Sequence, residues 1–335
     1  MIKKAKLFFI LLCGICAALS AQEPNSSKNP LMIIIPLGYD FMRLEEQTLH
    51  SPSAGIGFLL GKENLPFTEV EQRFMGMALY KPFIFTETPE YSVEGEQASS
   101  DLPKLYHQIQ AEFDGRIKRH QLLFSFQSSS NEPVIGGLHT FNIGGGWGYE
   151  LIRQPHVSLI LGALVAVSDF GITLPGGGVW PLLPLPFVRF GVDTQWFASS
   201  FDFLGDPSLT FTVAPKSKIR LTGDMRMKKF RSIDDLLCEF TLWYRFFDSG
   251  HKLGDFAGIG LGFKNGGKDF ALSGSETEDF GFRQRSVFAT LDLSILKIQG
   301  GWIFDSQYIV DNEKSGNPGK GFFISVGGMI PIGTR

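Results

Sequence analysis

The sequence predicts an all-β protein that closes into an antiparallel transmembrane β-barrel of about 12 to 16 strands, with about 14 favoured. Apolar and polar residues alternate with period two in many segments of about ten residues, the length that a tilted strand needs to cross a bilayer. Charged residues occupy the middle of the polar faces, where a hydrated lumen tolerates them and a dry core does not. No stretch after the N-terminal 21 residues has the length of an apolar transmembrane helix, so only β-structure could cross a membrane.

The clearest alternation is a predicted hairpin over residues 208–229. Its first strand alternates Leu, Phe and Val with Ser and Thr, and a polar turn follows at residues 214–217. Its second strand has an apolar face opposite a nearly unbroken charged one. A soluble sandwich would turn the charged face to bulk water, whereas a membrane barrel turns it to the lumen.

The N-terminus has the pattern of a secretory signal peptide at residues 1–21, with lysines before an apolar run and small residues before the expected cleavage. An uncleaved anchor is the alternative, but the apolar run is shorter than the ~18 residues needed to span a bilayer. Cys13 and Cys16 lie within this signal, without the small neighbours of a lipid-anchor site. The mature chain then keeps only Cys238, which excludes an intrachain disulfide.

Residues 22–30 form a polar lead, and residues 31–335 are expected to form a single barrel domain because no composition break divides them. The full chain has a formal net charge of −3, and removing three lysines and no acid with the signal gives −6. This mild acidity argues against nucleic acid as a partner.

Alternation marks fifteen segments with uncertain ends along the chain, from which about fourteen strands are expected. Their residues are 31–41, 53–60, 72–85, 105–114, 121–127, 138–151, 157–169, 188–196, 208–213, 218–228, 238–246, 257–264, 284–293, 298–304 and 322–332. His107 and Phe288 break the alternation of their strands. Polar loops are expected at residues 86–103, 265–279 and 311–320, and residues 170–185 form a loop that is rich in Gly and Pro yet apolar.

Several aromatic residues fall on the parity that would face lipid, where they could form interfacial girdles. These residues are Tyr80, Trp147, Tyr149, Trp196, Tyr244 and Trp302. Core filling in a soluble protein is the alternative explanation.

In its signal peptide, its alternation from residue 31 to 332 and its terminal amphipathic strand at residues 321–332, the chain resembles bacterial outer-membrane β-barrel proteins. The resemblance implies a bacterial outer-membrane location, with membrane lipid and the outer-membrane assembly machinery as partners. The chain departs from this class at its end, since Gly333, Thr334 and Arg335 replace the usual terminal aromatic residue.

Short turns and long loops should alternate between the two rims of such a barrel. Tracing this alternation back from the C-terminus places residues 170–185 on the periplasmic rim and the short turn at residues 153–156 outside. Either one strand is miscounted, or the segment rich in Pro folds inward.

Motifs for catalysis or cofactor binding are not found. The glycines of residues 142–148 are followed by no helix, so they are expected to relieve curvature or leave room in the lumen rather than to bind phosphate. The histidines lack metal-ligand spacing, and His251 near Asp248 and Asp255 is explained best by a solvated turn. We therefore expect no enzymatic activity, no cofactor and no metal.

The favoured function is porin-like passage or binding of small solutes through a narrow lumen of mixed charge. The candidate lumen residues are Arg189, Asp193, Arg220, Asp224, Arg226, Glu239, Arg245 and Asp292. The alternative is a non-conducting surface barrel that acts through its loops in adhesion or shielding. A membrane-embedded hydrolase is the least favoured reading, because no Ser, His and acid can be grouped.

Overall fold

The structure is a computed structural model of the whole chain. It describes residues 31–61, 72–89, 91–93, 96–98, 102–133, 140–173, 179–204, 206–227, 236–247, 257–273, 279–293, 295–311 and 313–333. The expected signal peptide at residues 1–21 and polar lead at residues 22–30 lie outside these ranges.

The described chain is built from β-strands. Their bounds are β1 (Leu31–Leu44), β2 (Thr48–Gly61), β3 (Gln72–Phe85), β4 (Tyr91–Val93), β5 (Glu96–Ala98), β6 (Leu105–Ile117), β7 (His120–Ser130), β8 (Phe141–Gln154), β9 (Val157–Thr173), β10 (Val179–Asp193), β11 (Phe197–Leu204), β12 (Asp206–Val213), β13 (Ile219–Met227), β14 (Leu236–Arg245), β15 (Ala257–Ala271), β16 (Asp279–Leu293), β17 (Leu296–Val310), β18 (Glu313–Gly316) and β19 (Gly321–Gly333).

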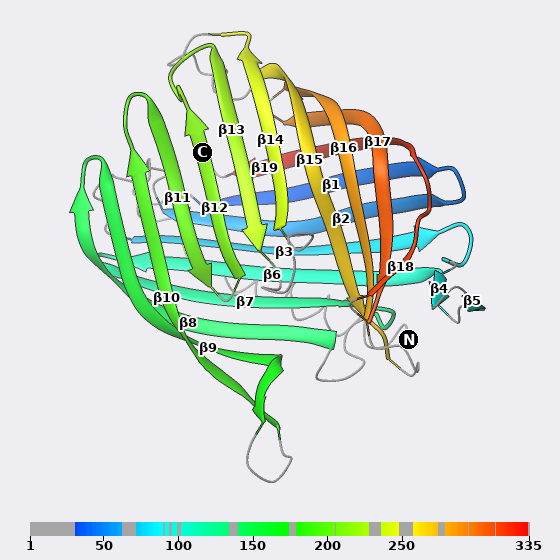
Figure 1. Cartoon of the computed structure of the whole chain (residues 1–335). Coiled ribbons are helices and arrows are strands. Elements are labelled where there is room, and N and C mark those ends of the chain that lie inside the picture. The colour runs from blue at the N-terminus through cyan, green and yellow to red at the C-terminus, as the bar shows by residue number, and fades with distance from the viewer. Residues whose placement is uncertain are drawn as a thin grey trace.

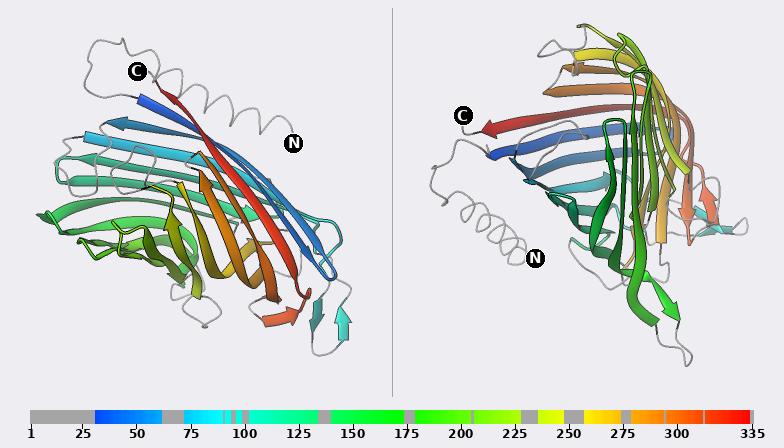
Figure 2. Two further views of the ribbon diagram at one scale, coloured as in Figure 1. Left: turned by 90° about the horizontal axis from the view of Figure 1, so that it is seen from above. Right: turned by 90° about the vertical axis from the view of Figure 1, so that its left-hand side faces the viewer.

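Most of these strands form a closed antiparallel barrel (Figure 1). Each wall strand pairs with its neighbours along the chain, and β1 pairs with β19 from Met32↔Gly333 to Leu44↔Gly321, which closes the wall. Figure 2 shows this closure in both views as blue β1 beside red β19. The main sheet has 17 strands, of which the short β18 pairs only with β17, so 16 described strands form the wall.

The expected number of about fourteen strands is therefore wrong, although the range of about 12 to 16 holds. Of the sixteen described wall strands, only β11 has no counterpart among the fifteen predicted segments. It follows a tight turn at residues 194–196, which the alternation places in the preceding strand. β11 has one charged residue, Asp202, and its apolar and polar residues alternate over only a few positions. The sequence pattern therefore does not separate β11 from β10. The segment at residues 170–185 is also largely strand, because β9 runs to Thr173 and β10 begins at Val179.

The extra strand removes the conflict over the two rims. One rim, the turn rim, carries the tight connections at residues 118–119, 155–156, 194–196 and 214–218 together with the outer ends of β1 and β19. The other, the loop rim, carries the described residues 45–47, 86–89, 102–104, 131–133 and 317–320. The end of β9 at Thr173 and the start of β10 at Val179 lie on the loop rim, and the turn at residues 155–156 lies with the other short turns.

Two expected loops contain ordered pairing. Within residues 86–103, β4 and β5 form a small separate hairpin. Within residues 265–279, β15 continues to Ala271 and stays paired with β16 as far as Asp279. The alternation of β15 is weak here because Asn265, Gly266 and Gly267 hide it.

The outer face of the wall is apolar. Large hydrophobic side chains on one parity of successive strands remain exposed, as Leu261 (66%), Leu242 (53%) and Trp302 (52%) illustrate. Residues paired directly across an antiparallel ladder share a face, so the registers extend this outward parity from strand to strand. No helix in the described ranges is both long and apolar enough to cross a membrane.

The expected girdle residues follow this outward face with one difference. Tyr80, Trp147, Tyr244 and Trp302 are exposed on wall strands, and Tyr149 shares the parity of Trp147. Trp196, which is 72% exposed, lies in the turn before β11 and not within a strand. An apolar outer face with exposed aromatic residues is the arrangement of outer-membrane barrels.

At the loop rim, two opposite parts of the wall come together. The described pairing of β7 with β8 ends at Ser128, and that of β15 with β14 ends at Asn265. Beyond these points β7 and β15 pair with each other in parallel through Ala271↔Ser130. We call this contact the seam. It closes a smaller ring made of β15, β16, β17, β19, β1, β2, β3, β6 and β7, nine strands of the described wall.

Candidate functional site

All of the candidate lumen residues from the sequence lie on the inward parity of the wall. Arg189 and Asp193 come from β10, Arg220, Asp224 and Arg226 from β13, Glu239 and Arg245 from β14, and Asp292 from β16. Their strand neighbours on the other parity, such as Ile219, Leu242 and Val287, are exposed large hydrophobics of the outer face. Whether these residues contact a solute stays a prediction.

Arg189 is held by carboxylates from two other strands. Its Nε donates to Asp202 on β11, and its Nη1 donates to Asp114 Oδ2 on β6 at 3.0 Å. Gln121 Nε2 on β7 also donates to both oxygens of Asp114, at 2.9 and 2.7 Å. β6 and β10 are four strands apart in the wall, so this contact across the inner face marks a sharply curved corner. Asp193 does not join the network: its backbone N–H bonds to the carbonyl of His156 at the turn rim.

Glycines on β8 allow this corner to form. A Cβ on Gly148 would lie 2.5 Å from the ring of Phe187 on β10, and one on Gly146 would lie 2.7 Å from Leu164 on β9. Phe187 is fully buried and packs with Ile160 and Leu164 in a small inward cluster. Among the glycines of residues 142–148, Gly146 and Gly148 thus leave room for inward side chains of neighbouring strands, one of the two roles that the sequence suggests.

The inward faces of β13 and β14 carry charges of both signs. Arg226 lies 3.5 Å from Asp224, and Lys264 on β15 lies 3.1 Å from Glu239. Arg245 donates from Nη2 to the carbonyl of Pro215 at 2.6 Å, which ties β14 to the turn at residues 214–218.

Trp243 is an inward aromatic residue between charged groups. Its Nε1 donates to Thr222 Oγ1 at 3.0 Å, while Arg220 and Lys297 lie over its ring at 5.8 and 5.9 Å from the centroid. Asp292 is the register partner of Lys297. The structure therefore brings Arg220 and Asp292 to the same part of the lumen through Trp243 and Lys297, which are not among the candidate residues predicted from the sequence.

A hydrophobic core fills the nine-strand ring near the loop rim. We call seven of its nine aromatic residues the aromatic cap, and they are Phe83, Phe85, Tyr106, Phe270, Phe280, Phe282 and Tyr308. Rings from β3 and β6 pack against rings from β15, β16 and β17. The ring centroids of Tyr106 and Phe270 are 4.6 Å apart, and the centroid of Phe280 is 5.3 Å from that of Tyr106 and 5.4 Å from that of Tyr308. Tyr106, Phe270 and Phe280 have at most 1% of their surface exposed. Ring closure by roughly eight strands leaves an interior that side chains can fill.

Polar groups lie next to the cap on the inward face. Lys81 on β3 pairs with Asp40 on β1, and Ser325 on β19 donates a hydrogen bond to the same carboxylate at 2.5 Å. Lys81 and Lys268, from opposite sides of the ring, lie 5.5 and 5.6 Å from the ring centroid of Phe83. The cap therefore borders a charged lumen.

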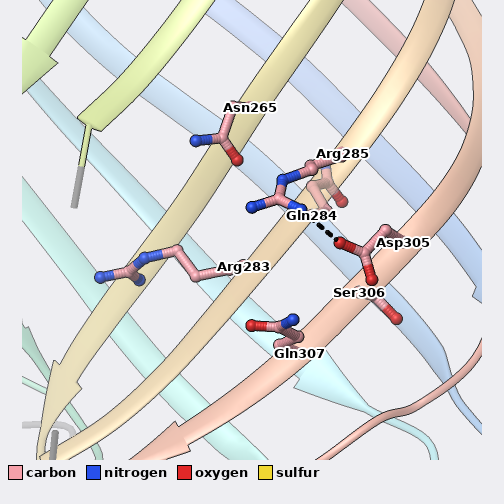
Figure 3. Close-up of a pocket in the computed structure, with 7 residues that line it drawn as sticks. All are labelled: Asn265, Arg283, Gln284, Arg285, Asp305, Ser306 and Gln307. Atoms are coloured by element: carbon pink, nitrogen blue, oxygen red, sulfur yellow. Dashed lines mark hydrogen bonds and ion pairs between the residues drawn. The ribbon is translucent and has the colours of Figure 1, made fainter. Parts of the chain in front are cut away.

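A second polar group lies on the outer face of β15–β17, near the loop rim. Figure 3 shows Asn265, Arg283, Arg285, Asp305 and Gln307 around a small pocket. Arg285 pairs with Asp305 at 3.0 Å, and Arg283 pairs with Asp269 at 2.6 Å. These side chains continue the outward parity of Phe263 and Val287, so they lie on the loop-rim side of the apolar surface and outside the lumen.

The cap could be found only in part from the sequence. Phe288 breaks its strand pattern because it faces inward and joins the core beside the cap. His107, the other exception, faces outward, where its Nδ1 lies 2.7 Å from the hydroxyl of Tyr80. Phe270 and Phe280 fall in or at the end of an expected loop, so the alternation offers no sign of them.

No group of three His, Cys, Asp or Glu is placed to hold a metal ion within the ranges that the structure covers. His251, Asp248 and Asp255 lie outside those ranges.

Comparisons with known proteins give structural likeness without sequence relatives. No family model and no curated protein matches the chain. Among solved structures, OpdQ of Pseudomonas aeruginosa is 12% identical with a TM-score of 0.38, and the match covers 92% of this chain and 100% of that one. OccAB3 of Acinetobacter baumannii is 7% identical with a TM-score of 0.38 and the same two coverages. OpdL of P. aeruginosa is 9% identical with a TM-score of 0.37, again at 92% and 100%. At these identities and scores the matches carry no argument about this chain, and its barrel rests on its own strand pairing.

Proposed function

We propose that the chain is a bacterial outer-membrane β-barrel that passes or binds small solutes through a lumen of mixed charge. The observation that carries this proposal is the size of the closed wall combined with its inward charges. Barrels of 16 strands enclose an aqueous channel, whereas those of about eight strands are filled. Charged side chains such as Arg220, Asp224 and Glu239 face inward, where water lowers the cost of placing them.

The outer face supports a position in the outer membrane. Its exposed Leu, Ile and Trp side chains would be costly in water over so large an area and suit lipid tails. By analogy with other barrels of this class, the turn rim would face the periplasm and the loop rim the exterior. The partners expected from this position are membrane lipid and the outer-membrane assembly machinery.

Conductance in planar lipid bilayers tests the proposal directly. The double variant Arg220→Glu/Arg226→Glu should shift the selectivity of the current towards cations, because two lumen cations become anions. Lys216→Glu/Lys218→Glu makes the same charge change in the exposed turn at residues 214–218 and should shift the selectivity less. No current and no solute uptake from correctly folded protein, judged by heat-modifiable migration on a gel, would contradict passage.

A non-conducting surface barrel is the second candidate, and the aromatic cap favours it because the cap fills part of the loop rim. In that case the connection at residues 86–104, with its β4–β5 hairpin, would be the place for partner contact. Removing residues 90–101 should then abolish partner binding while the barrel remains heat-modifiable. Deleting residues 265–279 would be a poor test, since Phe270 belongs to the cap.

A further inference from the structure

The loop rim is divided into two unequal parts by the seam. On one side lies the nine-strand ring, whose interior is occupied by buried hydrophobic side chains. On the other side lie β8–β14, the seven remaining described strands of the wall. The inward face of β10–β14 carries polar and charged residues, including Asp202, Ser208, Arg226 and Glu239. Ile160, Leu164 and Phe187 form a small apolar cluster on the inward face of β9 and β10.

The seam is held by polar contacts in addition to its single backbone bridge. Ser129 Oγ donates to the carbonyl of Asp269 at 2.8 Å. Asn131 Nδ2 donates to the carbonyl of Ser273 at 3.1 Å, and the Ser273 N–H donates to Asn131 Oδ1 at 2.8 Å. The strands that meet here are eighth neighbours around the 16-strand wall, so they belong to opposite sides of the barrel.

From this arrangement we infer that the seam and the aromatic cap act as the size filter of the barrel, and that solutes pass only along the inward face of β8–β14. The inference rests on the proposed function and states which wall the solute follows. A hydrated solute does not cross the ring half, because doing so would require it to separate buried aromatic rings and to lose its own water. The β8–β14 half offers hydrogen-bonding and charged groups instead.

The filter selects solute chemistry as well as size. Along β10–β14 the inward side chains carry charges of both signs, as the neighbours Asp224 and Arg226 and the cross-strand pair Arg189 and Asp202 illustrate. A route lined by both signs suits small zwitterionic or neutral polar solutes, since a solute of one charge meets repulsive groups at each step. The expected substrate class is therefore small polar molecules that carry both charges or none.

Removing two aromatic rings from the aromatic cap tests whether the cap acts as the size filter. In Phe270→Ala/Phe280→Ala, conductance should rise by roughly twofold and larger sugars should enter liposomes, because about half of the rim is released. Phe201→Ala/Phe263→Ala removes two rings from outward positions and should leave conductance unchanged. Both proteins are compared only after their heat-modifiable migration matches that of the native chain.

A thiol-blocking experiment tests the route without altering the cap. In a Cys238→Ala background, Ser208→Cys places a thiol on the inward face of β12, and Ser51→Cys places one on the inward face of β2 beside the ring core. A charged methanethiosulfonate reagent should reduce the current of the Ser208→Cys protein and leave that of the Ser51→Cys protein unchanged, since Ser51 is 1% exposed.

The outcomes separate the filter from the proposed function. If the native protein conducts and the cap variant conducts equally, or if block occurs at Ser51→Cys and not at Ser208→Cys, the filter is overturned while passage stands. If the native protein is silent and the cap variant conducts, the cap is a plug, and both solute passage by the native protein and the β8–β14 route are contradicted. If neither the native protein nor the cap variant conducts, both solute passage and the size filter are contradicted. Faster uptake of a singly charged sugar acid than of its neutral parent sugar would overturn the assigned substrate class.

Discussion

Asn131 and Ser273 exchange two hydrogen bonds although 142 positions separate them in the chain. The bonds tie the end of β7 to the end of β15, on the opposite side of the wall, next to the bridge between Ser130 and Ala271. This contact converts the loop rim from one wide opening into a filled ring and a separate half. It therefore sets the shape of the barrel at the rim where its longer connections lie.

The seam should contribute measurable stability. Asn131→Ala removes both hydrogen bonds, and at about 0.5–1.5 kcal/mol each the free energy of unfolding should fall by about 1–3 kcal/mol. The measurement is urea unfolding of the protein in lipid vesicles. Asn265→Ala is the matched control, because the Asn265 side chain donates to the carbonyl of Leu236 at 2.7 Å, away from the seam. Equal losses in the two variants would contradict a special role for the seam.

Arg189 should matter more for folding than Arg226. Arg189→Met leaves Asp202 and Asp114 without a shared cation, and the loss of two charged hydrogen bonds should cost roughly 2–4 kcal/mol. Arg226→Met should cost less than about 0.5 kcal/mol, since its side chain is 62% exposed and its pair with Asp224 is long. Unfolding free energies in the same vesicles compare them, and a larger loss at Arg226 would refute the assignment of the corner.

Alanine substitutions of inward and outward glycines on β8 should have different effects on stability. Gly148→Ala places a methyl group against Phe187 and Ile160 and should destabilise the barrel by about 1–3 kcal/mol through overpacking. Gly145→Ala, three residues away on the outward parity, meets only a backbone oxygen at 3.8 Å and should be close to neutral. Combining Gly148→Ala with Phe187→Ala should recover part of the loss caused by the glycine change. Without that coupling, the corner packing would not explain the glycine.

The two faces of the wall should respond differently to the same charge. Leu261→Arg puts a cation on the outer face of β15 and should cost about 2–4 kcal/mol in a bilayer. Thr210→Arg puts the same residue on the exposed inward face of β12 and should cost less than about 1 kcal/mol. Both are measured by reversible unfolding from vesicles, and a costly Thr210→Arg beside a harmless Leu261→Arg would mean that the faces are reversed.

The alternation of residues determined which side of each strand is apolar, and with it the barrel class and the inward position of charges such as Arg220 and Glu239. This is possible because successive side chains of a strand point to opposite faces, whichever strands lie beside it. Because the prediction depends on local alternation, it misses the weakly alternating β11 and gives too few strands.

Only the tertiary structure decided what the inward face encloses. The meeting of Arg189 with Asp114, the packing of Phe187 over Gly148 and the joining of Asn131 to Ser273 all depend on how the closed wall curves. The curvature of the wall depends on the registers of all the strands together, so the periodic pattern of one strand does not predict it. The aromatic cap is the clearest case: its rings come from five strands, and only closure brings them into contact.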